Sequence, residues 1–199
     1  MQKDLWIDTR LSEEEMNFLR DAVAVEQKKD TSNISKVIKD KDNWFYKSAL
    51  KKLTEKMFYD DWNNYRKYHI VEKEEPLPEF KMNRFWVNYM RQHEFNPIHK
   101  HNCLFSFVVF MKIPTHWKEQ HALSFSANSN MPSASDFQFL WGQGMGPITV
   151  MPIPLCPEDE GRIFFFPAWL NHQVFPFYEC EEERITISGN IIPKINANT

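Results

Sequence analysis

The chain has few cysteines and no long apolar run, and its first residues do not predict a secretory leader. Its three cysteines, Cys103, Cys156 and Cys180, are odd in number and show no close pairing pattern, which excludes a disulfide framework and suits a reducing compartment. No apolar stretch approaches the ~20 residues that a membrane-spanning helix needs, and the first residues do not begin a signal peptide. We therefore expect a soluble, cytoplasmic protein with no membrane partner.

A large field of positive charge is also missing. The 24 basic and 27 acidic residues give a formal charge of −3. The lysine-rich stretch 28–56 carries several acids as well, so a solvated helix surface explains it better than a nucleic-acid site. No nucleic-acid partner is expected.

Aromatic residues are abundant. The chain has 17 Phe, 7 Trp and 6 Tyr but only 5 Gly, a composition that fits a thick β core. A chain of 199 residues can bury roughly two-thirds of its unfolded surface, so it needs neither a metal nor a disulfide to fold.

The first part of the chain predicts helices. Ser12 and Glu15 have the spacing of a capping box, so a helix should run from about 13 to 27. Apolar positions at spacings of three and four predict a second helix within 44–68, and a short strand is possible at 34–37. The charged, proline-rich stretch 72–79 marks the change to strands.

The rest of the chain reads as short strands separated by turn signals. They are predicted at 84–90, 104–111, 122–126, 136–141, 148–153, 162–166, 173–176 and 184–192. This order predicts a mostly β protein with N-terminal helices: a double-stranded β-helix, or cupin-like jelly roll, with helices against one outer face. We expect an N-terminal helical segment, 1–80, packed on a jelly-roll catalytic core, 81–199, in one structural domain overall.

The last predicted strand has two different faces. Polar side chains alternate with isoleucines, which fits either a polar surface or a polar site inside the jelly roll with helices packed outside. The polar positions are Arg184, Thr186, Ser188 and Asn190, and the apolar ones are Ile185, Ile187 and Ile191.

Three histidines and this strand carry the candidate chemistry. His99 and His101 are two residues apart and should share one face of a strand, and His172 precedes Arg184 by twelve residues. Three imidazoles can hold a first-row transition metal, although a His-x-His pair alone also fits an exposed loop. The Arg184 guanidinium suits a carboxylate, and Thr186 points the same way.

These residues carry a resemblance to a known family. The sequence resembles the iron(II)/2-oxoglutarate-dependent oxygenases of the prolyl-4-hydroxylase-like kind, and most closely those encoded by tailed phages of marine cyanobacteria. The similar segments cover most of residues 82–192. They are Phe85–Tyr89, Glu94–His101, Ser106–Val109 with Ile113–Pro114, and Phe166–Asn190.

The resemblance implies a role for each residue. His99 matches the first metal ligand, His172 the distal ligand and Arg184 the anchor of 2-oxoglutarate. Thr186 and Asn88 are further candidate co-substrate contacts by their positions on the predicted strands, although core packing or a place at the edge of a ladder also fits Asn88. The family usually has a carboxylate where this chain has His101. Either three histidines suffice, at the cost of about one extra positive charge on the site, or Glu94 or Asp136 completes the set.

The resemblance also implies an activity: a hydroxylase that uses Fe(II), 2-oxoglutarate and dioxygen. Its substrate is unidentified, and a peptidyl-prolyl group in a protein or peptide is suggested by analogy alone. Two alternatives stay open, a metal cupin that does not use 2-oxoglutarate and a non-catalytic jelly-roll structural protein of a phage. A phage-encoded protein would act in the host cytoplasm.

Overall fold

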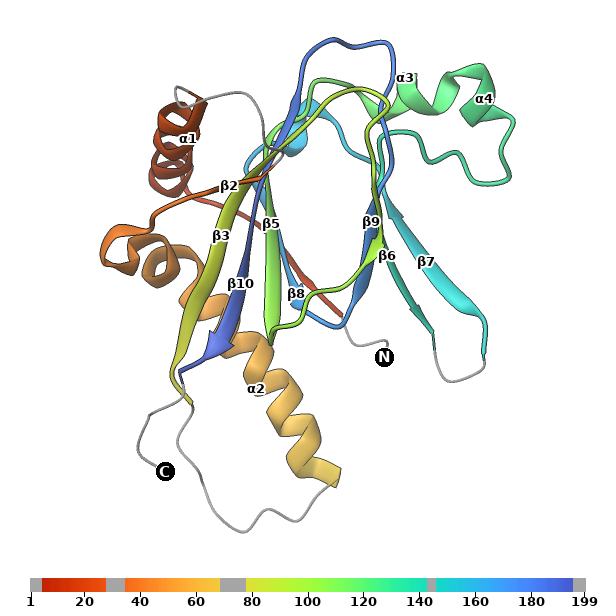
Figure 1. Ribbon diagram of the computed structural model, residues 1–199. Helices are drawn as coiled ribbons and strands as arrows, with labels where there is room; N and C mark the ends of the chain where they lie inside the picture. Colours follow the sequence, from red (N-terminus) through yellow and green to blue (C-terminus); the bar gives the residue numbers. More distant parts are fainter. Residues whose placement is uncertain (1–4, 28–34, 69–77, 143–145, 195–199) are drawn as a thin grey trace.

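Two antiparallel sheets face each other in the computed structural model, which describes residues 5–27, 35–68, 78–142 and 146–194 (Figure 1). Within these ranges the larger sheet has six strands in the order β1-β8-β5-β10-β3-β2, and the smaller has four in the order β4-β9-β6-β7. The strands of the larger sheet are β1 (Ile7–Arg10), β2 (Ser35–Val37), β3 (Phe80–Met90), β5 (Phe105–Lys112), β8 (Arg162–Pro167) and β10 (Arg184–Pro193). Those of the smaller sheet are β4 (Asn96–His99), β6 (Phe137–Gly142), β7 (Ile148–Ile153) and β9 (Asn171–Val174). The predicted jelly roll is confirmed.

Helices α1 (Glu13–Gln27) and α2 (Lys51–Tyr68) cover the outer face of the larger sheet, as expected (Figure 1). The predicted capping box begins α1: Ser12 N donates to Glu15 Oε2 at 2.8 Å, and Glu15 N donates to Ser12 Oγ at 3.3 Å. A helical turn, η2 (Tyr46–Leu50), leads directly into α2. No helix among the described residues is long and apolar enough to cross a membrane.

One predicted strand is wrong. Residues 122–126 lie in two short helices, α3 (Trp117–Ala122) and α4 (Ser124–Ala127), which sit apart from α1 and α2 (Figure 1). The amides of Ser126 and Ala127 both donate to the Leu123 carbonyl, so local bonds satisfy a backbone that a sheet would otherwise pair. Two 3-10 turns, η1 (Lys41–Asn43) and η3 (Pro157–Asp159), complete the elements.

The division at residue 80 stays a prediction, because most of the proline-rich stretch 72–79 lies outside the described residues. Ile34, at the start of the predicted short strand, lies outside them too. Both short strands of the first segment join the larger sheet, where β1 pairs with β8 and β2 pairs with β3.

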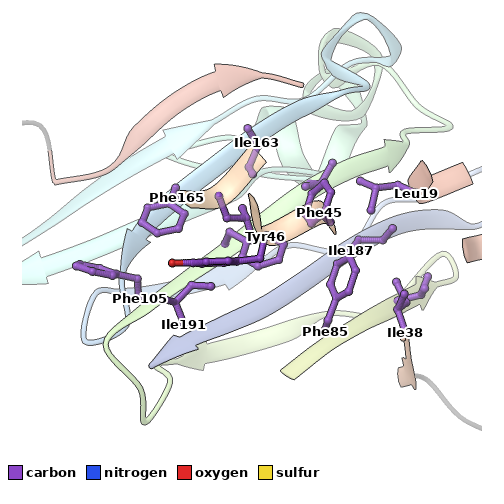
Figure 2. Close-up of a cluster of buried hydrophobic side chains, with 14 of the residues drawn as sticks. Leu19, Ile38, Phe45, Tyr46, Phe85, Phe105, Ile163, Phe165, Ile187 and Ile191 are labelled. Atoms are coloured by element: carbon purple, nitrogen blue, oxygen red, sulfur yellow. The ribbon is translucent and has the colours of Figure 1, made fainter. Parts of the chain in front are cut away.

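The two faces of β10 meet different surroundings. Its isoleucines enter the apolar core between the larger sheet and the helices, where Ile187 lies near Phe85 and Phe45 (Figure 2). Gly189 sits in this row because a Cβ there would lie 2.5 Å from the Phe107 ring. The side chains of Arg184, Thr186 and Ser188 face a cavity between the sheets instead. The sequence alternation therefore separates a packing face from a functional face.

Candidate active site

The three predicted histidines converge between the two sheets. Their ring centroids are 4.2 Å apart for His99 and His172, 5.1 Å for His101 and His172, and 5.3 Å for His99 and His101. One nitrogen of each ring lies within 4.8 Å of the other two. A metal ion can therefore contact all three side chains after small adjustments.

The strands explain part of this convergence. His99 on β4 and His172 on β9 are direct partners across an antiparallel pair, which brings their Cβ atoms close. The expectation that His99 and His101 share one strand face is wrong, since β4 ends at His99. The His101 amide instead donates to the Ala168 carbonyl at 2.9 Å, and this contact with the turn after β8 returns its ring to the site.

Two backbone carbonyls set which ring nitrogen can bind a metal. His99 Nδ1 lies 2.7 Å from the Pro97 carbonyl oxygen, and His172 Nδ1 lies 3.1 Å from that of Leu170. A carbonyl oxygen only accepts, so both Nδ1 atoms carry the proton and both Nε2 atoms keep a free lone pair. This is the arrangement that orients metal-binding histidines.

Burial keeps two of the rings neutral. Desolvation, with the nearby His99 ring as a lesser cause, lowers the pKa of His172 to about 3 and that of His101 to about 4. His172 is enclosed by aromatic rings, stacked on Phe137 at 5.8 Å and edge-on to Phe166 at 4.9 Å. Neutral imidazole is the form that binds metal, so these rings need not lose a proton first at neutral pH.

Arg184 lies on the wall of the same cavity, which has a volume of about 590 Å³. Its side chain is 1% exposed, and burial lowers its pKa to about 10, a value that still leaves it charged at neutral pH. Nη2 is bound to Ser135, while Nε and Nη1 have no hydrogen-bond partner among the described residues. Buried donors without partners are costly, so these two nitrogens point to an anionic ligand.

The other predicted co-substrate residues also line the cavity. Asn88 on β3 donates through Nδ2 to Thr186 Oγ1 at 3.4 Å and to Ser188 Oγ at 3.2 Å. Its Oδ1 accepts from Trp86 Nε1 at 3.0 Å. Asn88 and Thr186 thus form a polar floor beside Arg184.

Neither carboxylate considered as a ligand joins the histidines. Glu94 Oε2 accepts from the Arg91 amide at 2.7 Å in an exposed turn, although its side chain lines the cavity rim. Asp136 is fully buried and its Oδ1 lies 2.8 Å from His121 Nε2. Among the described residues, the histidine cluster therefore contains no carboxylate.

The three glutamates that precede Arg184 pair with other residues. Glu183 pairs with Arg91, Glu182 pairs with Lys112, and Glu181 accepts from Gln92. Sequence reasoning missed Ser135, the residue that holds Arg184. No local signal in the sequence links Ser135 to a side chain 49 residues away.

The residues present fit an iron and a dicarboxylate co-substrate. Three nitrogen ligands on one side of a cavity suit a first-row metal with open positions, and the partnerless nitrogens of Arg184 suit the far carboxylate. The one departure is the missing carboxylate ligand.

Comparison with known proteins supports the same conclusion. A family model described as "Putative 2OG-Fe(II) oxygenase" matches residues 84–190, more than half of the chain, and the match includes all three histidines and Arg184. No curated protein matches the sequence.

Solved structures match the fold along nearly the whole chain. A Pseudomonas putida prolyl-4-hydroxylase is 10% identical, with a TM-score of 0.56 over 97% of this chain and 95% of its own. A viral collagen prolyl hydroxylase from Paramecium Bursaria Chlorella virus-1 is 13% identical, with a TM-score of 0.52 over 96% and 91%. HygX from Streptomyces hygroscopicus, solved with nickel and 2-oxoglutarate, is 8% identical, with a TM-score of 0.54 over 96% and 83%. At these identities the likeness establishes the double-stranded β-helix fold. The family match shows that the chain belongs to the 2OG-Fe(II) oxygenase family, and the shared fold agrees with it. The protein is therefore a 2-oxoglutarate-dependent dioxygenase whose cofactors are Fe(II) and 2-oxoglutarate.

Proposed function

We propose that the protein is a hydroxylase in which His99, His101 and His172 hold Fe(II) and Arg184 binds 2-oxoglutarate. The observation that carries this proposal is the position of both groups on one cavity, where two donor nitrogens of the buried guanidinium bind no other group in the described part of the chain. Bound iron, with 2-oxoglutarate and dioxygen, supplies the oxidising power that converts a C–H bond to C–OH, with succinate and carbon dioxide as the other products.

The residues of this chain bind and orient the reactants. Arg184 neutralises the distal carboxylate of 2-oxoglutarate, while Thr186 and Asn88 offer hydroxyl and amide groups near it. Phe110, Phe137 and Phe166 form an apolar wall that excludes water from the reacting centre.

An all-histidine site changes the charge of the centre. Three neutral imidazoles leave the full +2 charge on the metal, whereas a carboxylate ligand would reduce it by one. The two negative charges of 2-oxoglutarate then face the metal and Arg184, so co-substrate binding compensates more positive charge here than at a site with a carboxylate. We expect metal and 2-oxoglutarate to strengthen each other's binding.

We further propose a peptidyl-prolyl substrate in a protein or peptide. Two structural neighbours of the same fold are prolyl hydroxylases, and the cavity opens at a rim where Phe95 is 65% exposed and Trp86 is half-buried. Aromatic side chains at an open rim suit an apolar ring such as that of proline. The relationship to phage oxygenases and a location in the host cytoplasm also stay proposals, supported by the sequence resemblance.

Succinate formation tests the reaction. Protein supplied with Fe(II), 2-oxoglutarate and air should form succinate, and proline-containing peptides should increase the rate and gain the mass of one oxygen atom. No succinate from metal-loaded protein would overturn the hydroxylase, whereas succinate without peptide oxidation would overturn only the substrate proposal.

The all-histidine ligand set also fits a metal cupin that binds its substrate directly, without 2-oxoglutarate. The variant Arg184→Gln separates the two functions, because it removes the charge that only the oxygenase needs. For the oxygenase we expect the Kd for 2-oxoglutarate to rise by at least about 30-fold, as for loss of one partner of a buried charge pair. Arg91→Gln is a matched control, since Arg91 is an exposed arginine that pairs with Glu183. An unchanged Kd in the Arg184 variant would favour the cupin.

A further inference from the structure

One residue of the turn before β6, Ser135, holds the Arg184 side chain by two hydrogen bonds. Arg184 Nη2 donates to the Ser135 carbonyl oxygen at 2.9 Å and to Ser135 Oγ at 2.5 Å. Both acceptors belong to the same residue, so Ser135 holds Nη2 through its backbone and its side chain. The two nitrogens without partners, Nε and Nη1, are thereby left for a ligand.

A ring fixes the guanidinium from a second direction. The Arg184 Cζ atom lies 5.1 Å from the centroid of the fully buried Phe177 ring. An arginine held by stacking and by two hydrogen bonds to one residue has lost most of its rotamer freedom before the ligand arrives. Such preorganisation reduces the entropy cost of binding.

Ser135 is itself held in an unfavourable backbone conformation. Its φ is +75°, in the left-handed region that non-glycine residues avoid, and its side chain is fully buried. The Ser135 amide donates to the Pro176 carbonyl at 2.8 Å, and Thr115 Oγ1 lies 3.3 Å from Ser135 Oγ. Glycine would fit this backbone better, so the hydroxyl has a role that glycine cannot fill.

The neighbouring Asp136 interacts electrostatically with Arg184 but forms no hydrogen bond with its guanidinium. Its fully buried carboxyl group faces His121, and its field raises the pKa of Arg184 against the larger effect of burial. In the described part of the chain, Arg184 forms no ion pair with any carboxylate. The guanidinium therefore stays available to an external anion.

We infer that Ser135 is a positioning residue for 2-oxoglutarate: it holds Nη2 so that Nε and Nη1 of Arg184 face the distal carboxylate. This inference rests on the proposed function, because it assumes that Arg184 binds the co-substrate. It predicts that the Ser135 hydroxyl contributes to recognition of the distal carboxylate and not to metal binding.

The variant Ser135→Gly tests this role, because glycine adopts the positive φ without strain and lacks the hydroxymethyl side chain that binds Nη2. Binding is measured anaerobically on Fe(II)-loaded protein with 2-oxoglutarate and with 2-oxopentanoate, the same chain with a methyl group in place of the distal carboxylate. We expect the Kd for 2-oxoglutarate to rise about tenfold, as for loss of one hydrogen bond to a charged group. The Kd values for 2-oxopentanoate and for Fe(II) should stay within about twofold, since neither ligand needs Arg184.

Two further variants separate positioning from folding. Ser135→Ala also lacks the hydroxyl but strains the backbone, so it should match Ser135→Gly in 2-oxoglutarate binding and unfold at a lower temperature. Ser133→Ala removes another buried serine hydroxyl of the same turn, which binds Gln138 and not Arg184, and should leave both keto acids unaffected.

The outcomes are distinguishable. Wild-type binding of 2-oxoglutarate by Ser135→Gly, alongside its loss in Arg184→Gln, would overturn the role of Ser135 and leave the proposed function standing. Equal weakening of both keto acids would also overturn it, because the effect would then not concern the distal carboxylate. Retained 2-oxoglutarate binding in Arg184→Gln would instead overturn the proposed function.

Discussion

Two groups of side chains in this protein have the composition of a metal site. One is the histidine cluster, His99, His101 and His172, and the other is a mixed cluster of His116, Cys156 and Glu158. In each group the candidate ligand atoms lie within 4.8 Å of one another. Proximity therefore does not distinguish them.

Hydrogen bonding does distinguish them. In the histidine cluster, carbonyl groups accept from Nδ1 of His99 and His172 and leave both Nε2 lone pairs free. In the mixed cluster, His116 Nδ1 accepts from the Lys118 amide at 3.1 Å and caps α3, so its lone pair is used and Nε2 carries the proton.

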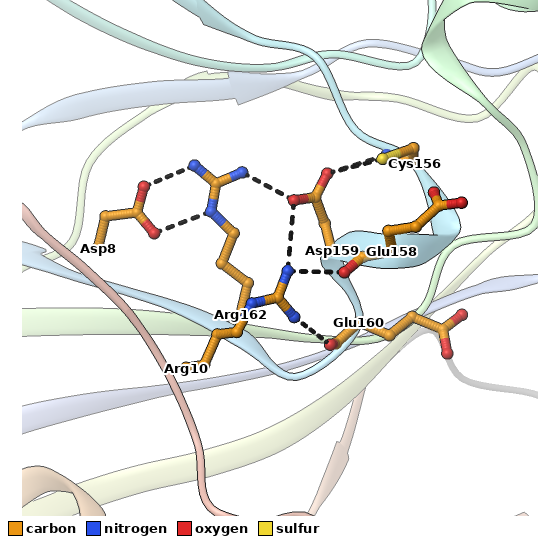
Figure 3. A network of polar contacts seen from close by, with 7 residues as sticks. All are labelled: Asp8, Arg10, Cys156, Glu158, Asp159, Glu160 and Arg162. Carbon is orange, nitrogen blue, oxygen red and sulfur yellow. Dashed lines mark hydrogen bonds and ion pairs between the residues drawn. The ribbon is translucent and has the colours of Figure 1, made fainter.

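The thiol of the mixed cluster is also engaged. Cys156 Sγ donates to Asp159 Oδ2 at 3.3 Å, and the Asp159 carboxylate is held in turn by Arg162 (Figure 3). Burial and neighbouring acidic groups raise the pKa of Cys156 to about 11, so it is protonated at neutral pH. Cysteine binds a metal as the thiolate, and this thiol is protonated and hydrogen-bonded. We therefore interpret the mixed cluster as structural contacts and not as a metal site. Free lone pairs on the ligand atoms, more than close spacing, therefore distinguish the histidine cluster as a metal site.

The largest expected effect comes from removing one histidine of each cluster. His99→Ala should lower Fe(II) affinity by more than about 100-fold, exceeding the effect of losing a group that only orients a ligand. His116→Ala, an equally half-buried histidine, should leave the affinity within about twofold. Anaerobic calorimetry measures both. A comparable loss of Fe(II) affinity in the His116 variant would contradict the assignment of the metal site to the histidine cluster.

A smaller effect is expected at His101, the position where the family usually has a carboxylate. His101→Ala should lower Fe(II) affinity by about 10- to 100-fold, because His99 and His172, the two rings that backbone carbonyls orient, remain. His101→Asp should recover most of that loss, since a carboxylate is also a ligand for iron. If His101→Ala binds iron as wild type does, His101 is no ligand and the three-histidine centre is wrong.

A third effect concerns the stability of the metal-free protein at acid pH. The pKa of His172 is about 3 when folded and about 6.5 when unfolded, so below pH 6.5 the unfolded chain binds more protons and stability falls as pH falls. Between pH 7.5 and 4.5 this one group should remove roughly 2 to 3 kcal/mol. Thermal unfolding should show that His172→Asn reduces the acid loss and that His116→Asn does not.

Patterns within one segment were readable from the sequence. The alternation along β10 separated the isoleucines, which lie in the outer core, from Arg184, which lies in the cavity, and the capping box predicted the start of α1. Each depends on neighbours a few residues apart, where strand or helix geometry alone decides which way a side chain points.

Features that depend on contacts between distant parts of the chain could not be predicted from the sequence. The position of the His101 ring depends on a hydrogen bond to the Ala168 carbonyl. The hydrogen bonds between Ser135 and Arg184 join residues that are 49 positions apart. The short helices α3 and α4 replaced a predicted strand, because propensity alone cannot tell whether a sheet edge is near enough to pair.

The most direct test is an anaerobic titration of Fe(II) and 2-oxoglutarate followed by visible absorption. A weak charge-transfer band should reach its maximum at one iron per chain in the wild type and in His116→Ala. It should be absent in His99→Ala and need much more 2-oxoglutarate in Arg184→Gln. A wild-type protein that binds iron but forms no band, or an undiminished band in His99→Ala, would contradict the account.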